Sequence, residues 1–173
     1  GDKMYVKGMD GSKKIKDIFI NSKIKLSERD SWPIVLDSKN RVVLPPSFKN
    51  DLGNIFYLTI SSGKKLEIRN VQEFENFVDK IDQNNQLDPN IQKYKRFILA
   101  RTIKVETDKL GRFLIPENFL KAIAIKKTIS FVGMGRIIEI WASENLEMQL
   151  DELENDSTID DLAAEMLKKG YKL

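Results

Sequence analysis

Two short stretches of the chain carry the residues best suited to chemistry, and they are versions of one another. Residues 37–48 read DSKNRVVLPPSF, and residues 108–119, 71 positions later, read DKLGRFLIPENF. Each begins with an aspartate and has an arginine four positions on, Asp37 with Arg41 and Asp108 with Arg112. A short carboxylate at the start of a tight turn accepts hydrogen bonds from the turn amides and stiffens the loop. The planar arginine fork is then suited to bidentate pairing with a guanine edge or a phosphate.

The residues between each aspartate and its arginine favour a tight, basic turn. Gly111 allows the positive φ that such turns often need, and Asn40 is the next best residue for it. Lys39 and Lys109 add positive charge, although at different offsets from the arginine. Two interpretations stay open on this chemistry alone. The arginines are presented to a partner, or the Asp–Arg pairs only fix the turns, at about 0–1 kcal/mol for each surface ion pair.

The composition excludes the commonest catalytic and metal-binding chemistries. The chain has neither cysteine nor histidine, which rules out disulfides, thiolate sites, Ser–His–Asp triads and histidine-bound zinc. No acids are paired for acid–base work, and no P-loop or GxGxxG sequence occurs. We therefore expect no enzyme activity, no catalytic residue, no metal and no cofactor. No run of 18 apolar residues occurs, so we expect no membrane partner.

Charge is divided unevenly along the chain. The net charge of +3 combines a balance of +9 over residues 1–141 with one of −6 over residues 142–173, where nine acids outnumber three lysines. A basic body suits a polyanionic partner, and an acidic tail suits self-screening or assembly. Ordinary surface lysines and a solvated acidic helix would give the same balance, so charge alone does not decide the function.

Hydrophobic periodicity and turn residues predict the same order of elements twice, with each D-x-x-x-R unit between two strands. The first copy predicts strands over 32–36 and 41–44, a short helix to residue 52, strands over 55–60 and 64–69, and a helix capped by Asn70. The second predicts strands over 103–106 and 112–115, a short helix to residue 123, strands over 128–132 and 136–141, and a helix capped by Ser143. Further helices are predicted over 91–100 and 159–167.

These elements divide the chain into five parts. They are an N-terminal extension (1–30), a first repeat (31–82), a linker and helix (83–101), a second repeat (102–153) and an acidic helical tail (154–173). The extension has a possible short strand or helix around Ile15, Ile18, Phe19 and Ile24. Strands this short cannot bury a core within one half of the chain. We therefore expect an α+β fold, in which two repeats pack about a pseudo-twofold axis into one mixed β-barrel with flanking helices.

The doubled motif, the segment RFILA at 96–100 and the segment VGMGRIIEIW at 132–141 together resemble the MraZ family. That family is a branch of the AbrB-like (SpoVT–AbrB) DNA-binding proteins, and the resemblance covers roughly residues 32–167. It implies a bacterial transcriptional regulator of the division and cell-wall gene cluster, cytoplasmic and nucleoid-associated. It also implies a ring of identical subunits that binds tandem promoter repeats in double-stranded DNA.

Carried onto this chain, the resemblance assigns DNA binding to residues of the two loops: Asp37, Lys39, Asn40, Arg41, Asp108, Lys109, Gly111 and Arg112. The chain departs from the family pattern in having about 30 residues before the first strand, Asn40 where glycine is common, and Pro33 after Trp32. A competing interpretation keeps the fold but leaves the Asp–Arg pairs to turn structure. The protein would then be a non-DNA, antitoxin-like interaction module.

Overall fold

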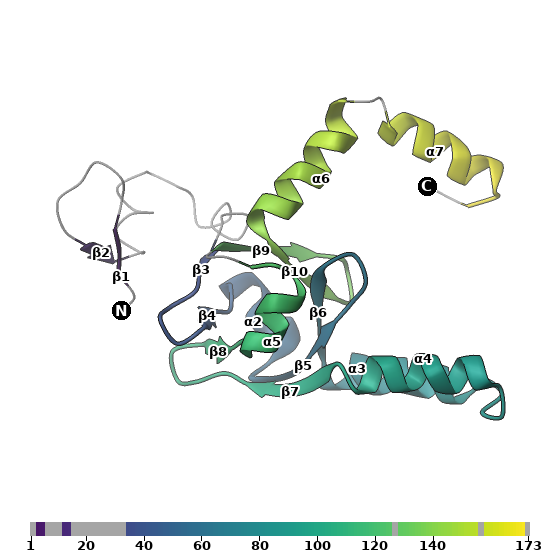
Figure 1. Ribbon diagram of the computed structural model, residues 1–173, viewed down its shortest axis with the longest axis horizontal. Coiled ribbons are helices and arrows are strands. Elements are labelled where there is room, and N and C mark those ends of the chain that lie inside the picture. Colours follow the sequence, from purple (N-terminus) through teal and green to yellow (C-terminus); the bar gives the residue numbers. More distant parts are fainter. Residues whose placement is uncertain (1–2, 6–11, 15–33, 126–127, 156–157, 172–173) are drawn as a thin grey trace.

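A curled antiparallel sheet, with two short helices inside its curve and longer helices outside, forms the body of the protein in the computed structural model (Figure 1). The structure describes residues 3–5, 12–14, 34–125, 128–155 and 158–171. The predicted start of the first strand at Trp32 and Pro33, and the segment from Ile15 to Ile24, lie outside these residues.

The elements follow one another in the order that the sequence predicts. An N-terminal ribbon pairs β1 (Lys3–Tyr5) with β2 (Ser12–Lys14). The first half then contains β3 (Ile34–Val35), β4 (Arg41–Val43), α2 (Pro46–Leu52), β5 (Ile55–Ile60), β6 (Lys65–Asn70), α3 (Val71–Asp82) and α4 (Pro89–Leu99). The second contains β7 (Thr102–Glu106), β8 (Arg112–Leu114), α5 (Glu117–Ala122), β9 (Thr128–Gly133), β10 (Ile138–Ala142), α6 (Ser143–Asn155) and α7 (Thr158–Lys168). The predicted duplication is therefore confirmed.

Local signals in the sequence account for where the helices begin. Proline opens α2, where its missing N–H and restricted φ cost nothing. The side chain of Asn70 accepts a hydrogen bond of 2.8 Å from the amide of Glu73 and so caps α3 as predicted. Asp88 caps α4 in the same way, accepting from the amide of Asn90 at 2.7 Å.

The two repeats share their strands rather than forming separate sheets. The six-stranded sheet has the order β3-β9-β10-β6-β5-β7, and β4 pairs with β8 in a separate ribbon. Four of these pairings, β3–β9, β10–β6, β5–β7 and β4–β8, join one repeat to the other. The α+β class with two repeats in one shared sheet is confirmed. Every pairing among the described strands is antiparallel, so the expected barrel is a curled antiparallel half-barrel and not a mixed one.

Equivalent residues of the two repeats face each other at two places. Val42 and Phe113, 71 positions apart, are direct partners in the β4–β8 ribbon. Glu67 and Glu139, 72 positions apart, are direct partners between β6 and β10. A residue can lie opposite its own equivalent only on a local twofold axis, so the expected pseudo-twofold axis passes through both pairings.

The core fills the concave side of the sheet. Phe56 and Phe113 meet edge to face there, with ring centroids 5.1 Å apart at an interplanar angle of 89°. Leu52 of α2 and Phe119 and Leu120 of α5 pack into the same core, which agrees with the position of these helices within the curve (Figure 1). The largest fully buried side chains come from both repeats: Phe56, Phe113, Leu58, Leu66, Ile68, Ile115, Ile123, Ile129, Ile140 and Val42.

Two helical hairpins project from the body of the molecule (Figure 1). In the first, α3 packs against β5 and β6, and α4 packs against α3. In the second, α6 packs against β9 and β10, and α7 packs against α6. Among the described residues, no helix combines the length and the apolar character needed to cross a membrane.

The position of Phe113 on the axis leads to a stability prediction. The side chain is 1% exposed and contacts Phe56, so we expect Phe113→Ala to lower the free energy of unfolding by about 3–5 kcal/mol through the cavity it leaves. Urea titration followed by the fluorescence of the buried Trp141 measures this at fixed protein concentration. The matched control is the next residue, Leu114, which is 52% exposed, and Leu114→Ala should change stability by about 0.5 kcal/mol or less. Equal losses in the two variants would contradict this account of the core.

Candidate nucleic-acid interface

The first loop is organised around the carboxylate of Asp37. Its Oδ1 accepts the backbone N–H groups of Lys39 and Arg41, each at 2.9 Å. Its Oδ2 accepts Nε of Arg41 at 2.8 Å and lies 2.6 Å from Nη2 of the same guanidinium. The amide of Asp37 donates to the carbonyl of Arg41 at 2.9 Å and closes the loop. One aspartate thus satisfies two turn amides and orients one arginine.

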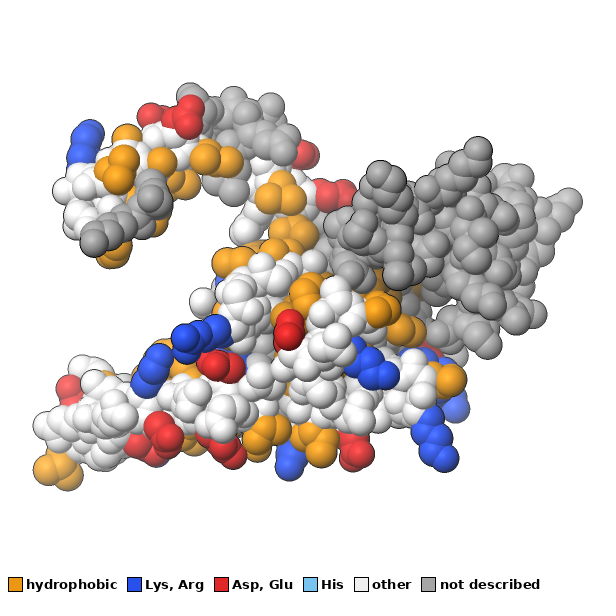
Figure 2. All heavy atoms as spheres, turned by 180° about the vertical axis from the view of Figure 1, so that it is seen from behind, with side chains coloured by type: hydrophobic (Ala, Val, Ile, Leu, Met, Phe, Trp, Pro, Cys, Tyr) orange, Lys and Arg blue, Asp and Glu red, His pale blue; other side chains and the backbone are white. Residues whose placement is uncertain are grey.

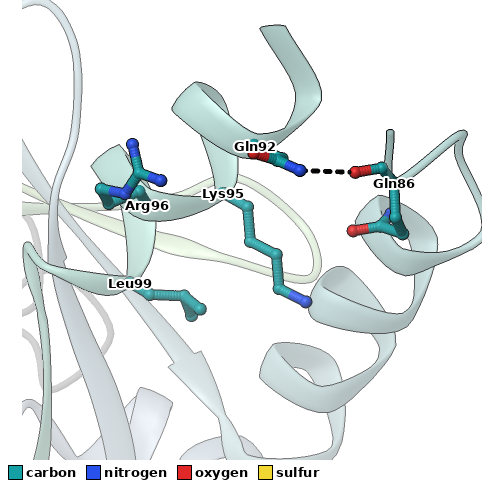
Figure 3. Close-up of a pocket in the computed structure, with 5 residues that line it drawn as sticks. All are labelled: Gln86, Gln92, Lys95, Arg96 and Leu99. Atoms are coloured by element: carbon teal, nitrogen blue, oxygen red, sulfur yellow. Dashed lines mark hydrogen bonds between the residues drawn. The ribbon is translucent and has the colours of Figure 1, made fainter. Parts of the chain in front are cut away.

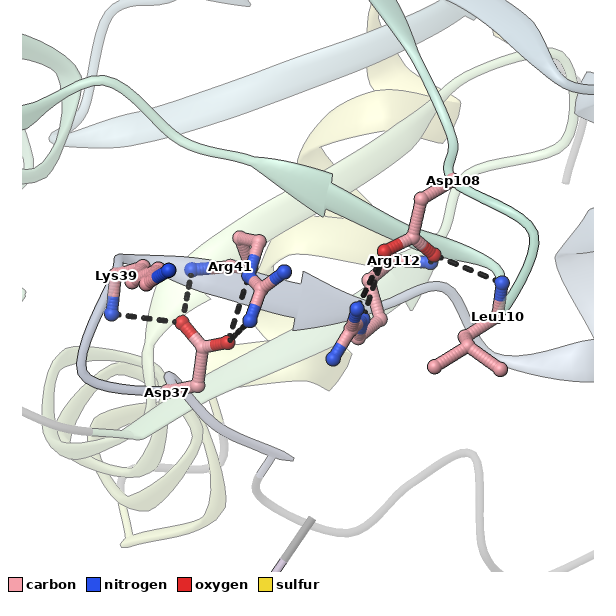
Figure 4. A network of polar contacts seen from close by, with 6 residues as sticks. All are labelled: Asp37, Lys39, Arg41, Asp108, Leu110 and Arg112. Carbon is pink, nitrogen blue, oxygen red and sulfur yellow. Dashed lines mark hydrogen bonds and ion pairs between the residues drawn. The ribbon is translucent and has the colours of Figure 1, made fainter. Parts of the chain in front are cut away.

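The second loop repeats this arrangement around Asp108 (Figure 4). Oδ1 accepts the amides of Leu110 at 2.9 Å and Arg112 at 3.0 Å, and Oδ2 contacts Nε of Arg112 at 2.8 Å and Nη2 at 2.7 Å. The amide of Asp108 closes the loop onto the carbonyl of Arg112 at 2.8 Å. The loops differ at one equivalent position, since Leu110 occupies the place of Lys39.

The predicted positive φ is present at the same position of both loops. Asn40 has φ of 59° and Gly111 has φ of 72°. Their carbonyls also connect the loops to the opposite repeat, because Leu44 donates to Gly111 at 2.9 Å and Ile115 donates to Asn40 at 3.0 Å. The left-handed residue of each loop is therefore tied to the end of the other repeat's strand.

Hydrogen bonding lowers the pKa of both aspartates. The guanidinium and then the backbone amide of Arg112 lower the pKa of Asp108 to about 2, with a smaller contribution from the amide of Leu110. For Asp37, partial burial raises the pKa, but the bonds from Arg41 and the amide of Lys39 outweigh it, so the pKa lies below its ordinary value. Both carboxylates are therefore ionised at neutral pH and bind their arginines as full charges.

The structure brings the two loops together on one short ribbon. Because β4 and β8 are antiparallel, the loops lie at opposite ends of it, with Arg41 beginning one strand and Arg112 the other. Val42 and Phe113 point into the core at 1% exposure each, so the arginines stand on the outward face. The arginine side chains are 31% exposed for Arg41 and 18% for Arg112. The sequence-predicted residues therefore form one surface, with lysines exposed in both loops.

The Asp–Arg pairs agree with both interpretations of the motif. They are internal ion pairs that stabilise the turns, and they also set the direction of the guanidinium. A guanidinium has five N–H donors, and the ion pair uses Nε and Nη2, which form one side of the fork. The Nη1 end takes no part in the ion pair. The aspartate therefore prepares the arginine for an acceptor at its tip while reducing the freedom it would lose on binding.

The described residues offer little for catalysis or metal binding. They contain no cluster of three or more Asp or Glu side chains placed to bind a metal ion. A shallow pocket lies between α3 and α4, where Nε2 of Gln92 donates to the carbonyl of Gln86 at 2.8 Å (Figure 3). Lys95, Arg96 and Leu99 complete its lining, and no residue of the two loops contributes.

The low pKa of Asp108 predicts an acid-sensitive loop. An ordinary aspartate in an unfolded chain titrates near a pKa of about 3.9, and the folded value is about 2. The stabilisation is therefore complete above pH ~4 and is lost as the pH falls through this window. We expect Asp108→Asn to lower the free energy of unfolding at pH 7, by an amount that shrinks at pH 3. Urea titration at both pH values tests this against Asp79→Asn, which removes an exposed acid of α3. A loss of equal size at both pH values would exclude the ion pair as its cause.

Comparison with known proteins agrees with this geometry. The model of the MraZ protein family, which its description relates to antitoxins, matches residues 33–97 and again residues 98–169. A shorter match places residues 1–50 with the TilS substrate C-terminal domain, a relationship of the N-terminal extension that sequence reasoning missed. The loop residues 37–41 lie within both matches.

Similar proteins of known name cover most of the chain. The transcriptional regulator MraZ of Mycoplasma mobile is 42% identical over 83% of this chain and 98% of its own length. The corresponding protein of Mycoplasmopsis pulmonis is 38% identical over 79% of this chain and 92% of its own. That of Dictyoglomus thermophilum is 37% identical over 78% and 94%. With both repeats matched and relatives covered almost end to end, the chain belongs to the MraZ family.

Proposed function

We propose that this protein is a sequence-specific DNA-binding transcriptional regulator. The single observation that carries the proposal is the β4–β8 ribbon, which presents two aspartate-oriented arginines from pseudo-equivalent loops on one face. A two-stranded β-ribbon fits the major groove, and arginine pairs there with O6 and N7 of guanine. The relatives named as transcriptional regulators support the same role. The residues proposed for DNA are those of the two loops, with arginines on base edges and lysines on phosphates.

The proposal extends to assembly. Two arginines per chain give little sequence discrimination, whereas several copies bound to tandem promoter repeats gain affinity through avidity. Tyr94 and Phe97 on α4 are 50% and 47% exposed, and Ile159 and Leu162 on α7 are 58% and 44% exposed. Figure 2 shows the apolar side chains along α7. Helix α4 has basic residues and no acid, whereas α7 has acids at Asp160, Asp161 and Glu165. A head-to-tail contact between the two helices in neighbouring copies would close into a ring.

The target and location follow from the family resemblance. We propose promoters of the division and cell-wall gene cluster as targets, bound in the cytoplasm at the nucleoid. The competing function is a protein-interaction module, which the antitoxin-like description of the family supports. It requires no DNA affinity, so the DNA measurements below distinguish the two.

The arginines provide the first test. Promoter DNA bound by the full chain is selected from a random-sequence pool, and affinity is measured by electrophoretic shift. We expect Arg41→Ala and Arg112→Ala each to cost about 1–3 kcal/mol per lost bidentate contact and to relax the base preference at one position. Unchanged binding by both variants would refute direct readout.

Lys39→Ala is the matched control, since it removes a charge from the same loop without touching a proposed base contact. It should weaken binding to all sequences alike and lower the slope of log affinity against log salt by about 1. A change of base preference in this variant would contradict the division of roles between arginines and lysines.

Light scattering tests the assembly. We expect the full chain to have several times the mass of one subunit, and Leu162→Asp to reduce that mass because a charge enters the apolar face of α7. Met134→Asp, at a 55% exposed position of the β9–β10 turn, is the control and should leave the mass unchanged. Comparison with a chain lacking residues 1–30 shows whether the extension limits assembly. A monomeric full chain would refute the avidity mechanism.

A further inference from the structure

The outward face of the β4–β8 ribbon carries two exposed apolar side chains as well as the two arginines. Val43 is 36% exposed and Leu114 is 52% exposed. They occupy equivalent positions of the two repeats, 71 residues apart, each two residues after its arginine. Alternation along a strand places residues i and i+2 on one face, so each repeat presents arginine and then an aliphatic side chain outward.

The strand register places each apolar side chain beside the arginine of the other repeat. Leu114 is the direct partner of Arg41, and Val43 is the direct partner of Arg112. Directly opposed residues have Cβ atoms about 4.5–5.5 Å apart. The ribbon therefore presents two arginine–aliphatic pairs, each contributed by both repeats and related by the pseudo-twofold axis.

We propose that Leu114 and Val43 contact the C5-methyl groups of thymines next to the bases bound by the arginines. The inference rests on the DNA-binding function proposed above and adds the base that the second half of each pair recognises. In the major groove thymine is distinguished by its methyl group, which pairs with apolar side chains, while arginine pairs with guanine. A separation of about 5 Å on the ribbon corresponds to roughly one or two base-pair steps of about 3.4 Å.

The surroundings of the two side chains favour DNA over a protein partner. Specific protein interfaces cover about 800 Å² on each side, whereas here two aliphatic side chains stand between arginines. Lys39 and Lys109 are exposed in the loops at the two ends of the ribbon, where a phosphate backbone would pass. A small apolar contact with a basic border is the pattern expected for a base edge within a groove.

Replacing thymine by uracil tests the inference, because it removes only the methyl group. The probe is the duplex selected for the arginine experiment, with each thymine beside a guanine replaced in turn, and affinity is measured by fluorescence anisotropy with the full chain. We expect the unmodified chain to bind the uracil duplex about fourfold more weakly for each buried methyl lost. Leu114→Ala should bind the thymine duplex more weakly and lose the difference between thymine and uracil at one position. Val43→Ala should do the same at the other.

The matched control is Leu87→Ala. Leu87 is 86% exposed in the segment between α3 and α4, so this variant should keep both the affinity and the difference between the two bases. Far-ultraviolet circular dichroism checks that each variant is folded, and the comparison of thymine with uracil on the unmodified chain needs no variant at all.

The possible failures are distinguishable. If no duplex binds, the proposed DNA-binding function falls and this inference falls with it. If the chain binds in an arginine-dependent way but does not distinguish thymine from uracil, only the methyl contact is refuted. A selected site without thymine beside its guanines would refute it too, as would an unchanged difference between the bases in both Leu114→Ala and Val43→Ala.

Discussion

The pairing of β4 with β8 is the interaction on which both the fold and the candidate interface depend. Each strand has three residues and comes from a different repeat, so neither is stable without the other. Pairing buries Val42 and Phe113 against the common core and, by alternation, turns Arg41 and Arg112 outward. The same hydrogen bonds that join the two halves of the chain therefore set the spacing of the arginines.

The ion pairs within the loops are structural and also suited to recognition. In each loop one carboxylate binds two turn amides and one guanidinium, which is a strong, charge-assisted arrangement for so short a segment. An arginine already oriented by Asp37 or Asp108 has less side-chain entropy to lose when it meets an acceptor. The distinction between a turn-forming motif and a binding motif is thus not a choice between alternatives. The turn chemistry is what makes the arginine ready to bind.

The pseudo-twofold axis has a cost on the other face of the sheet, where it places two glutamates opposite each other. Glu139 is compensated by Nζ of Lys65 at 2.5 Å and Nε1 of Trp141 at 2.9 Å. Glu67 is compensated by Nη2 of Arg69 at 2.7 Å and by a hydrogen bond of 2.6 Å from the hydroxyl of Ser61. The compensating residues are not related by the axis. The repeats have thus diverged where symmetry alone would bring like charges together in a partly buried setting.

The sequence by itself determined the features that depend on near neighbours. The duplicated loops, the helix starts at Pro46 and Asn70, and the left-handed residues Asn40 and Gly111 were all predictable, because turns and caps involve only a few consecutive residues. Only the tertiary structure decided which strands pair, that they pair antiparallel, and that an arginine of one repeat stands beside an aliphatic side chain of the other. Those partners are 71 or so residues apart, and their register is set by burying Val42 and Phe113 in one shared core. No local pattern in either strand carries that information.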